Sequence, residues 1–269
     1  MTKEYSIGVF DSGVGGTTVL KIMAEILPHE NIIYYADSGN APYGKKTVDH
    51  YNKNDELQSL CFNIMDFFLK NRCKAVVIAC NTATAAALTA IKERYDIPVI
   101  GVINPGAKAA ANMSKNGHIA VLATPFTANS NAYGEEIKKI SKKVSVYQEG
   151  CSELCTMIEE GWENFENRGD ILDGHISQFP GSADTLVLGC THYPIIKEDI
   201  EKYFSGKIVD PAKETVIELV EALRDDDLLN DSKDRGKIEF FVSGNKEQFR
   251  KIAEKFLGFE VKKLYQIEK

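Results

Sequence analysis

Short apolar runs rich in β-branched residues alternate with amphipathic segments over most of this chain of 269 residues. Most runs are almost continuously apolar, as strands are when both faces of a sheet are covered. The segments between them repeat apolar residues at helical spacing. This alternation predicts an α/β fold with helices packed on a largely parallel sheet. The expected strands are residues 7–10, 31–35, 75–79, 98–102, 118–122, 144–147 and 185–189.

The sequence also contains an internal repeat. The stretch around Cys80, AVVIACNTATAAAL, resembles TLVLGCTHYPII, in which Cys190 is the equivalent residue. At a similar offset, IGVFDSGVGG (7–16) matches IAVLATPFTA (119–128). Two matches in the same order predict two related α/β halves that face each other across a cleft.

We expect the first domain to comprise residues 1–98 and 211–269, and the second to comprise residues 99–210. Gly206 and Pro211 interrupt regular structure near the second boundary. The tail after Pro211 contains two helical segments and the apolar run KIEFFV, and its return to the first half would balance the two sizes.

Composition excludes several classes of function. The 32 Lys and Arg and the 39 Asp and Glu give a net charge of −7, and no dense basic cluster predicts a nucleic-acid partner. The start of the chain lacks the pattern of a signal peptide, and no apolar run approaches the length of a membrane span, so we expect a cytoplasmic protein without membrane attachment. The six cysteines are therefore expected as free thiols. Cys151 and Cys155 lack a matching second pair of ligands, so no metal site is expected.

Cys80 and Cys190 each follow an apolar strand and precede a helical segment. In open α/β sheets, ligands bind beyond the carboxyl ends of strands, where helix N-termini offer free N–H groups. An isolated cysteine is usually a small buried apolar residue, but a duplicated polar neighbourhood favours a functional role. The neighbours suit an anionic ligand such as a carboxylate, and they are Asn81, Thr82, Thr191 and His192.

Other strand ends carry further polar residues. DSGVGG (11–16) matches neither a dinucleotide fingerprint nor a P-loop, so its glycines indicate a tight turn. Asp11 is either a helix cap or a group that accepts a proton or orients an ammonium, with Ser12 beside it. Thr124 and Thr127 lie at the strand end that matches Asp11 in the repeat.

Five motifs together resemble the glutamate racemases of the aspartate/glutamate racemase family. They are DSGVGG (11–16), PYG (42–44), ACNTATA (79–85), ATPFT (123–127) and GCTHYP (189–194). The resemblance implies two flavodoxin-like domains, an active site between them, and cofactor-independent interconversion of L- and D-glutamate for peptidoglycan synthesis. It also implies a homodimer.

The resemblance further implies the roles of individual residues. Cys80 and Cys190 would be the two catalytic acid–base groups, and Glu159, in the run MIEEG, looks like an accessory acidic residue. The remaining residues would contact substrate or tune the thiols, and they are Asp11, Ser12, Tyr43, Gly44, Asn81, Thr82, Thr124, Thr127, Thr191 and His192.

This chemistry needs one base on each face of the α-carbon, one a thiolate and the other a thiol. Free cysteine titrates near pH 8.5, so we expect a helix N-terminus and a neighbouring donor to lower the pKa of each thiol. Our hypothesis is that Asp11 assists Cys80 and His192 assists Cys190. Backbone N–H groups, with Thr82 and Thr191, would hold the substrate carboxylate.

Three alternatives remain open at this point. A cysteine hydrolase or amidotransferase would use Cys190 as nucleophile and His192 as base. An amino-acid binding module would close its two lobes on a ligand without any reaction. An aspartate racemase of the same family would differ only in its substrate.

Overall fold

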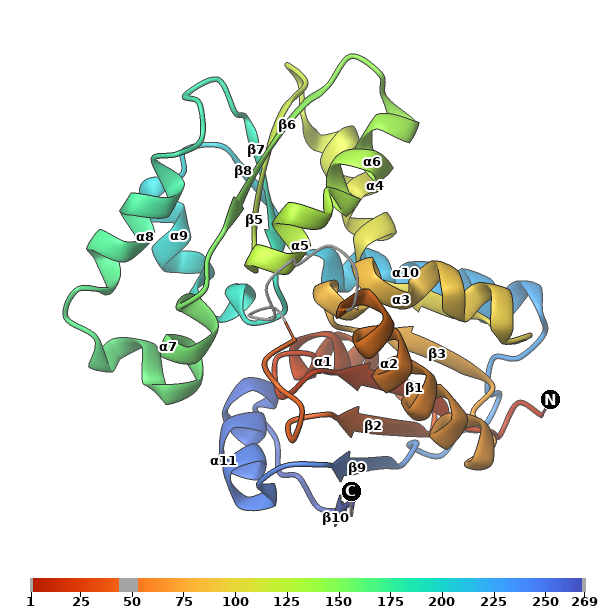
Figure 1. The fold of residues 1–269 in the computed structure, drawn as a ribbon. Coiled ribbons are helices and arrows are strands. Elements are labelled where there is room, and N and C mark those ends of the chain that lie inside the picture. The colour runs from red at the N-terminus through yellow and green to blue at the C-terminus, as the bar shows by residue number, and fades with distance from the viewer. Residues whose placement is uncertain (1, 44–52, 268–269) are drawn as a thin grey trace.

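The computed structural model describes residues 2–43 and 53–267, whose strands form two separate sheets (Figure 1). The larger sheet has the strand order β10-β9-β2-β1-β3-β4, and all its neighbouring strands are parallel. These strands are β1 (Ile7–Asp11), β2 (Ile32–Ala36), β3 (Ala75–Ile78), β4 (Val99–Gly101), β9 (Ile238–Val242) and β10 (Leu264–Gln266).

The smaller sheet has the strand order β6-β5-β7-β8 and is also parallel throughout. Its strands are β5 (His118–Ala123), β6 (Ser145–Gly150), β7 (Thr185–Gly189) and β8 (Lys207–Val209). The order β2-β1-β3-β4 in the larger sheet is therefore repeated in the smaller one, with β5 in the place of β1 and β7 in the place of β3. This is the beginning of the flavodoxin-like order, and it confirms the prediction of two similar, mainly parallel α/β halves.

Helices cover both faces of each sheet, as expected for buried parallel strands. Within the described part of the chain, no helix combines the length and the apolar character that crossing a membrane requires. The helices are α1 (Thr17–Ile26), α2 (Lys53–Lys70), α3 (Asn81–Arg94), α4 (Ile103–Met113), α5 (Pro125–Ser130), α6 (Ala132–Ile140), α7 (Leu154–Gly161), α8 (Arg168–Ile176), α9 (Lys197–Tyr203), α10 (Pro211–Asp225) and α11 (Lys246–Leu257), with short 3₁₀ turns η2 (Trp162–Asn164) and η3 (Tyr193–Ile196).

Alternating residues of each strand enter different parts of the core, because successive side chains of a strand point to opposite faces. In β1, Ile7 and Val9 join a cluster with α1, α10 and α11, whereas Phe10 joins a second cluster with α2 and α3. The first cluster continues into the smaller sheet through Ala120 and Leu122. One apolar core thus connects the two halves.

The sheets also bear on the expected division of the chain. β4, which follows Pro98, pairs with β3 in the larger sheet. Near the second expected boundary, α10 begins at Pro211 and contacts both α1 and α4, and β9 then pairs with β2.

Candidate active site

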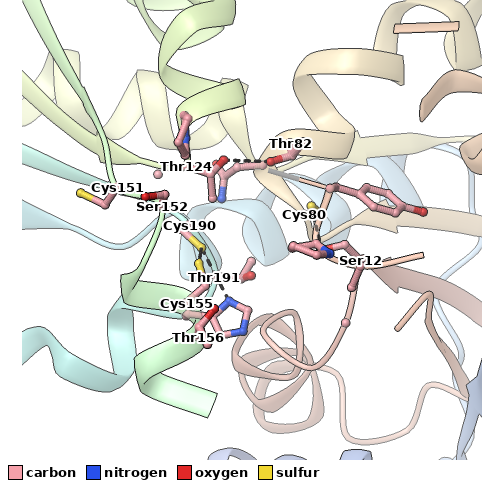
Figure 2. A pocket seen from close by; sticks show the side chains of 18 of the residues that line it. Ser12, Cys80, Thr82, Thr124, Cys151, Ser152, Cys155, Thr156, Cys190 and Thr191 are labelled. Carbon is pink, nitrogen blue, oxygen red and sulfur yellow. Dashed lines mark hydrogen bonds between the residues drawn. The ribbon is translucent and has the colours of Figure 1, made fainter. Parts of the chain in front are cut away.

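A cavity of about 290 Å³ lies at the carboxyl ends of β1, β3, β5 and β7. Figure 2 shows Cys80 and Ser12 on one side of it and Cys190 and Cys155 on the other. The repeat thus places its two equivalent cysteines on opposite walls of one cavity. Of the predicted site residues, those that line it are Ser12, Tyr43, Cys80, Asn81, Thr82, Thr124, Glu159, Cys190, Thr191 and His192.

Cys80 is the N-cap residue of α3, because β3 ends just before it and its extended backbone leads into the helix. The N–H of Ala83 donates to its Sγ atom at 3.4 Å, and the thiol lies 3.7 Å from the Ser12 hydroxyl. Burial, followed by the charge of Asp11, raises the pKa of Cys80 to about 12, although the donors from Ala83 and Ser12 oppose this shift. The expectation that a helix N-terminus lowers this pKa is therefore wrong, because loss of water outweighs the donors.

Cys190 directly follows β7, and its side chain is only 6% exposed. Its Sγ atom lies 3.3 Å from Sγ of Cys155 and 3.6 Å from Nδ1 of His192. The contact with Cys155 and then burial raise the pKa of Cys190 well above its usual value, while His192 acts in the opposite direction. The expected lowering of this pKa is therefore also wrong, and the largest influence that raises it is the contact with a second thiol.

His192 lies between Cys190 and Glu159 of α7, whose Oε1 atom is 2.8 Å from Nε2 of the imidazole. Burial acts to lower the pKa of His192, but its contacts with Cys190 and Glu159 raise it well above the usual value. The site therefore favours an imidazolium that can donate to a sulfur on one side and to a carboxylate on the other. Glu159 and His192, 33 residues apart in sequence, form one unit beside Cys190.

Asp11 is 1% exposed and lies at the end of β1, while the next two residues of the turn line the cavity. Its carboxylate accepts from the N–H of Gly13 at 2.8 Å and from the Thr191 hydroxyl at 3.4 Å. Burial raises the pKa of Asp11, whereas His192 opposes that shift. Asp11 thus connects the turn after β1 to the loop after β7, and it influences Cys80 through its charge.

The hydroxyls of Thr82, Thr124 and Thr127 lie within hydrogen-bonding distance of one another at the cavity. Oγ1 of Thr82 lies 3.0 Å from that of Thr124 and 3.2 Å from that of Thr127, and the latter two are 3.1 Å apart. Thr82 and Thr124 line the cavity, whereas Thr127 is fully buried behind them. The predicted hydroxyl donors Thr82 and Thr124 therefore hydrogen-bond to each other, and Thr127 positions both of them from behind.

Two further predicted residues are fixed by partners that the sequence did not indicate. The hydroxyl of Tyr133 in α6 donates to Oδ1 of Asn81 at 2.8 Å, and the hydroxyl of Tyr43 donates to Asp37 at 2.5 Å. Gly44 lies outside the described residues. Asn81 and Tyr43, which line the cavity, are thus held by partners that do not line it.

Gly15 has a role beyond the tight turn expected for it. A Cβ atom at this position would lie 2.5 Å from Nδ1 and Cε1 of His192 and 2.5 Å from Oγ1 of Thr191. The turn after β1 therefore packs directly against the loop after β7, and only glycine leaves room for the imidazole in its present position.

Among the lining residues that sequence reasoning did not predict, four belong to one segment: Cys151, Ser152, Cys155 and Thr156. They follow β6 and begin α7, and their approach to β7 depends on tertiary packing. A signal was present for one of them, because Cys155 and Glu159 are four residues apart and so share a helical face. The pair Cys151–Cys155 was considered only as two ligands of one metal ion.

Comparison with known proteins agrees with the motifs. The Asp/Glu/Hydantoin racemase family model matches residues 7–219. A glutamate racemase of Fusobacterium nucleatum is 48% identical over 267 residues, which covers 99% of each chain. The crystal structure of the glutamate racemase isoform RacE1 from Bacillus anthracis superposes with a TM-score of 0.93 at 36% identity, covering 99% of this chain and 98% of that one. A glutamate racemase from Francisella tularensis in complex with D-glutamate superposes with a TM-score of 0.91, at 36% identity and the same coverage.

Proposed function

Because this chain belongs to the Asp/Glu/Hydantoin racemase family, we propose that it is an isomerase that interconverts L- and D-glutamate through Cys80 and Cys190. The observation that carries the proposal is that two equivalent cysteines of an internal repeat line opposite walls of one cavity. The full-length similarity to glutamate racemases supports glutamate as the substrate.

In the proposed reaction, the thiolate of one cysteine removes the α-proton of glutamate and becomes a thiol. The electron pair of the broken C–H bond remains on the α-carbon as a carbanion next to the carboxylate. The thiol of the other cysteine then gives its proton to the opposite face and becomes a thiolate. One proton is removed and one is added, so the product is the enantiomer and the two cysteines have exchanged protonation states.

The first requirement is a thiolate in a buried cavity. With a pKa of about 12, ionising Cys80 at pH 7 costs roughly 7 kcal/mol before substrate binds. The α-ammonium of glutamate offsets this cost when it binds beside the thiol, because an opposite charge at close range favours the ionised form. Asp11 adds a second negative group that attracts the ammonium to this wall. Substrate binding and thiol ionisation are therefore coupled.

The second requirement is stabilisation of the carbanion. Thr82 and Thr124 present hydroxyls to the cavity, next to the N-terminus of α3. These donors suit the substrate carboxylate, on which negative charge accumulates as the proton leaves. On the other wall, the His192 imidazolium stabilises the thiolate of Cys190, and Glu159 holds the imidazole in place.

The proposal is tested with Cys80→Ser and Cys190→Ser, assayed with each enantiomer of glutamate in deuterium oxide. We expect each substitution to reduce turnover by at least about a thousandfold, because a serine hydroxyl is a far weaker acid than a thiol. Cys73→Ala is the matched control, since Cys73 is a buried cysteine outside the cavity. Near-normal turnover in either serine variant would contradict the two-thiol mechanism.

The same assay separates the alternatives. Aspartate racemase activity requires turnover of L- or D-aspartate that equals or exceeds that of glutamate. A hydrolase using Cys190 and His192 would release ammonia from glutamine and would not need Cys80. A binding module would retain glutamate without placing deuterium at its α-carbon.

We further propose that the enzyme is cytoplasmic, forms a homodimer, needs no cofactor, and supplies D-glutamate for peptidoglycan synthesis. These expectations rest on the resemblance to the family. Light scattering on the purified protein tests the dimer, and full activity after exhaustive dialysis without added cofactor tests cofactor independence. Rescue of a depleted strain by external D-glutamate tests the biosynthetic role.

A further inference from the structure

Two thiols and an imidazole meet on one wall of the cavity. Sγ of Cys190 lies 3.3 Å from Sγ of Cys155 and 3.6 Å from Nδ1 of His192. One ligand atom from each residue falls within 4.8 Å of the other two. We propose that Cys155, Cys190 and His192 form a binding site for Zn²⁺, and that the bound ion inhibits the enzyme reversibly by occupying Cys190.

The spacing of these atoms agrees with tetrahedral coordination. Zinc binds thiolate sulfur at about 2.3 Å and imidazole nitrogen at about 2.0–2.1 Å, which separates two sulfurs by about 3.8 Å and a sulfur from a nitrogen by about 3.6 Å. The observed 3.3 Å between the sulfurs therefore needs to widen by only about half an ångström. The distance from Cys190 to His192 already matches. A disulfide would require the two sulfurs to close to about 2.05 Å, which is a larger movement.

Glu159 supplies the outer partner that zinc-binding histidines usually have. Its Oε1 atom accepts from Nε2 of His192 at 2.8 Å, on the side of the ring away from Cys190. When this bond holds the proton on Nε2, the lone pair of Nδ1 is free to bind a metal ion. The carboxylate–histidine pair is thus already assembled in the orientation that a metal site needs.

The cluster is also accessible to an ion from outside. Cys155, Cys190 and His192 all line the cavity, although Cys190 and His192 are 6% and 7% exposed. Three protein ligands leave one position of a tetrahedral ion open toward the cavity, where water or a substrate carboxylate can bind. The site has no signature in the sequence, because the partner of Cys155 is Cys190, 35 positions later, rather than Cys151.

Binding changes the protonation of the cluster. Zn²⁺ replaces the protons of the two thiols and the Nδ1 proton of the His192 imidazolium, and all three protons leave to solvent. The ion then forms one bond to each thiolate and one to the neutral imidazole. Cys190 can then neither take nor give a proton, so racemisation stops until the ion is removed. This inhibition rests on the proposed function, whereas binding of the metal does not.

The test measures metal binding and activity separately on the full-length, reduced protein. Co²⁺ is used as the spectroscopic probe, since thiolate ligands give it an intense charge-transfer absorption, and Zn²⁺ affinity is measured by competition with a coloured chelator. The variants are Cys155→Val, which removes one proposed ligand, and Glu159→Gln, which removes the outer partner. Cys73→Ala is the control.

We expect one ion per chain, a thiolate–cobalt absorption that Zn²⁺ abolishes, and loss of racemase activity that a chelator restores. Affinity should fall by at least about a hundredfold in Cys155→Val, by about 10- to 100-fold in Glu159→Gln, and not in the control. Unchanged affinity in Cys155→Val, or no thiolate–cobalt absorption, would overturn the proposal. So would inactivation that a thiol reductant reverses and a chelator does not, because that result identifies a disulfide. If the cobalt spectrum is as expected but the protein does not racemise glutamate, the metal site stands and the proposed function fails.

Discussion

Gly15 offers the sharpest test of how the turn after β1 controls the opposite wall of the cavity. In Gly15→Ala, the new methyl group would lie 2.5 Å from His192 ring atoms and from the Thr191 hydroxyl. Ordinary contact begins near 3.4 Å, so these groups must separate by about 0.9 Å. The imidazole has little room to move without losing its 2.8 Å bond to Glu159 or its 3.6 Å contact with Cys190.

A displacement of this size is costly for catalysis. Misplacing a reacting group by about 1 Å reduces rates by about a hundredfold, which corresponds to about 2.7 kcal/mol of transition-state stabilisation. We therefore expect kcat/KM for glutamate to fall by about two orders of magnitude in Gly15→Ala. Stability should decrease by no more than about 1–3 kcal/mol, because the clash involves side chains that can shift slightly.

The assay is steady-state racemisation in both directions, with unfolding in urea recorded on the same samples. Gly174→Ala is the control, because a Cβ atom there meets nothing within 4 Å and the residue lies in α8. If Gly15→Ala is folded and its kcat/KM stays within threefold of the parent, the inference that His192 must keep its position is refuted.

Two further predictions concern stability. Lys74 and Glu30 form a buried ion pair at 2.5 Å, so Lys74→Met should lower the free energy of unfolding by about 3–5 kcal/mol in urea titrations, and adding Glu30→Gln should recover most of the loss. Burial raises the pKa of Cys73 to about 12, as it does for Cys80. Since each folded-state pKa exceeds the unfolded value of about 8.5, each thiol's contribution is complete below that pH and declines by about 1.4 kcal/mol per pH unit above it, up to about pH 12. Urea titrations from pH 8 to 10.5 should therefore show a free energy of unfolding that falls as the pH rises, and it should fall less steeply with pH in Cys73→Ala. The same dependence on pH in Cys73→Ala and in the parent would contradict this reasoning.

The sequence was most informative where local pattern determines position. Continuous apolar runs located β1, β3, β5 and β7, and the polar residues directly after them had to lie at the same edge of a parallel sheet. Cys80 and Cys190 follow from this rule together with the repeat. The same pattern predicted a strand at residues 98–102, where β4 lies, but its position beside β3 depends on pairing between strands rather than on its own residues.

Contacts between distant segments could not be predicted in the same way. Cys155 meets Cys190 because α7 packs against η3, the turn that follows β7. Tyr133 of α6 meets Asn81, the first residue of α3, across a separation of 52 residues. The thiol pKa values depend on burial, which no local pattern specifies. A helix N-terminus is visible in the sequence, but the amount of water around it is a property of the whole fold.

The two walls of the cavity are built differently, with a serine hydroxyl beside Cys80 and an imidazole, a carboxylate and a second thiol near Cys190. Under the proposed function, this inequality has a limited effect on the kinetics. Enantiomers have equal free energies in water, so the equilibrium constant between them is one and kcat/KM must be the same in both directions. Differences between the two walls can therefore make kcat differ between the two directions only if KM differs by the same factor. The enantiomer with the lower KM must have the lower kcat.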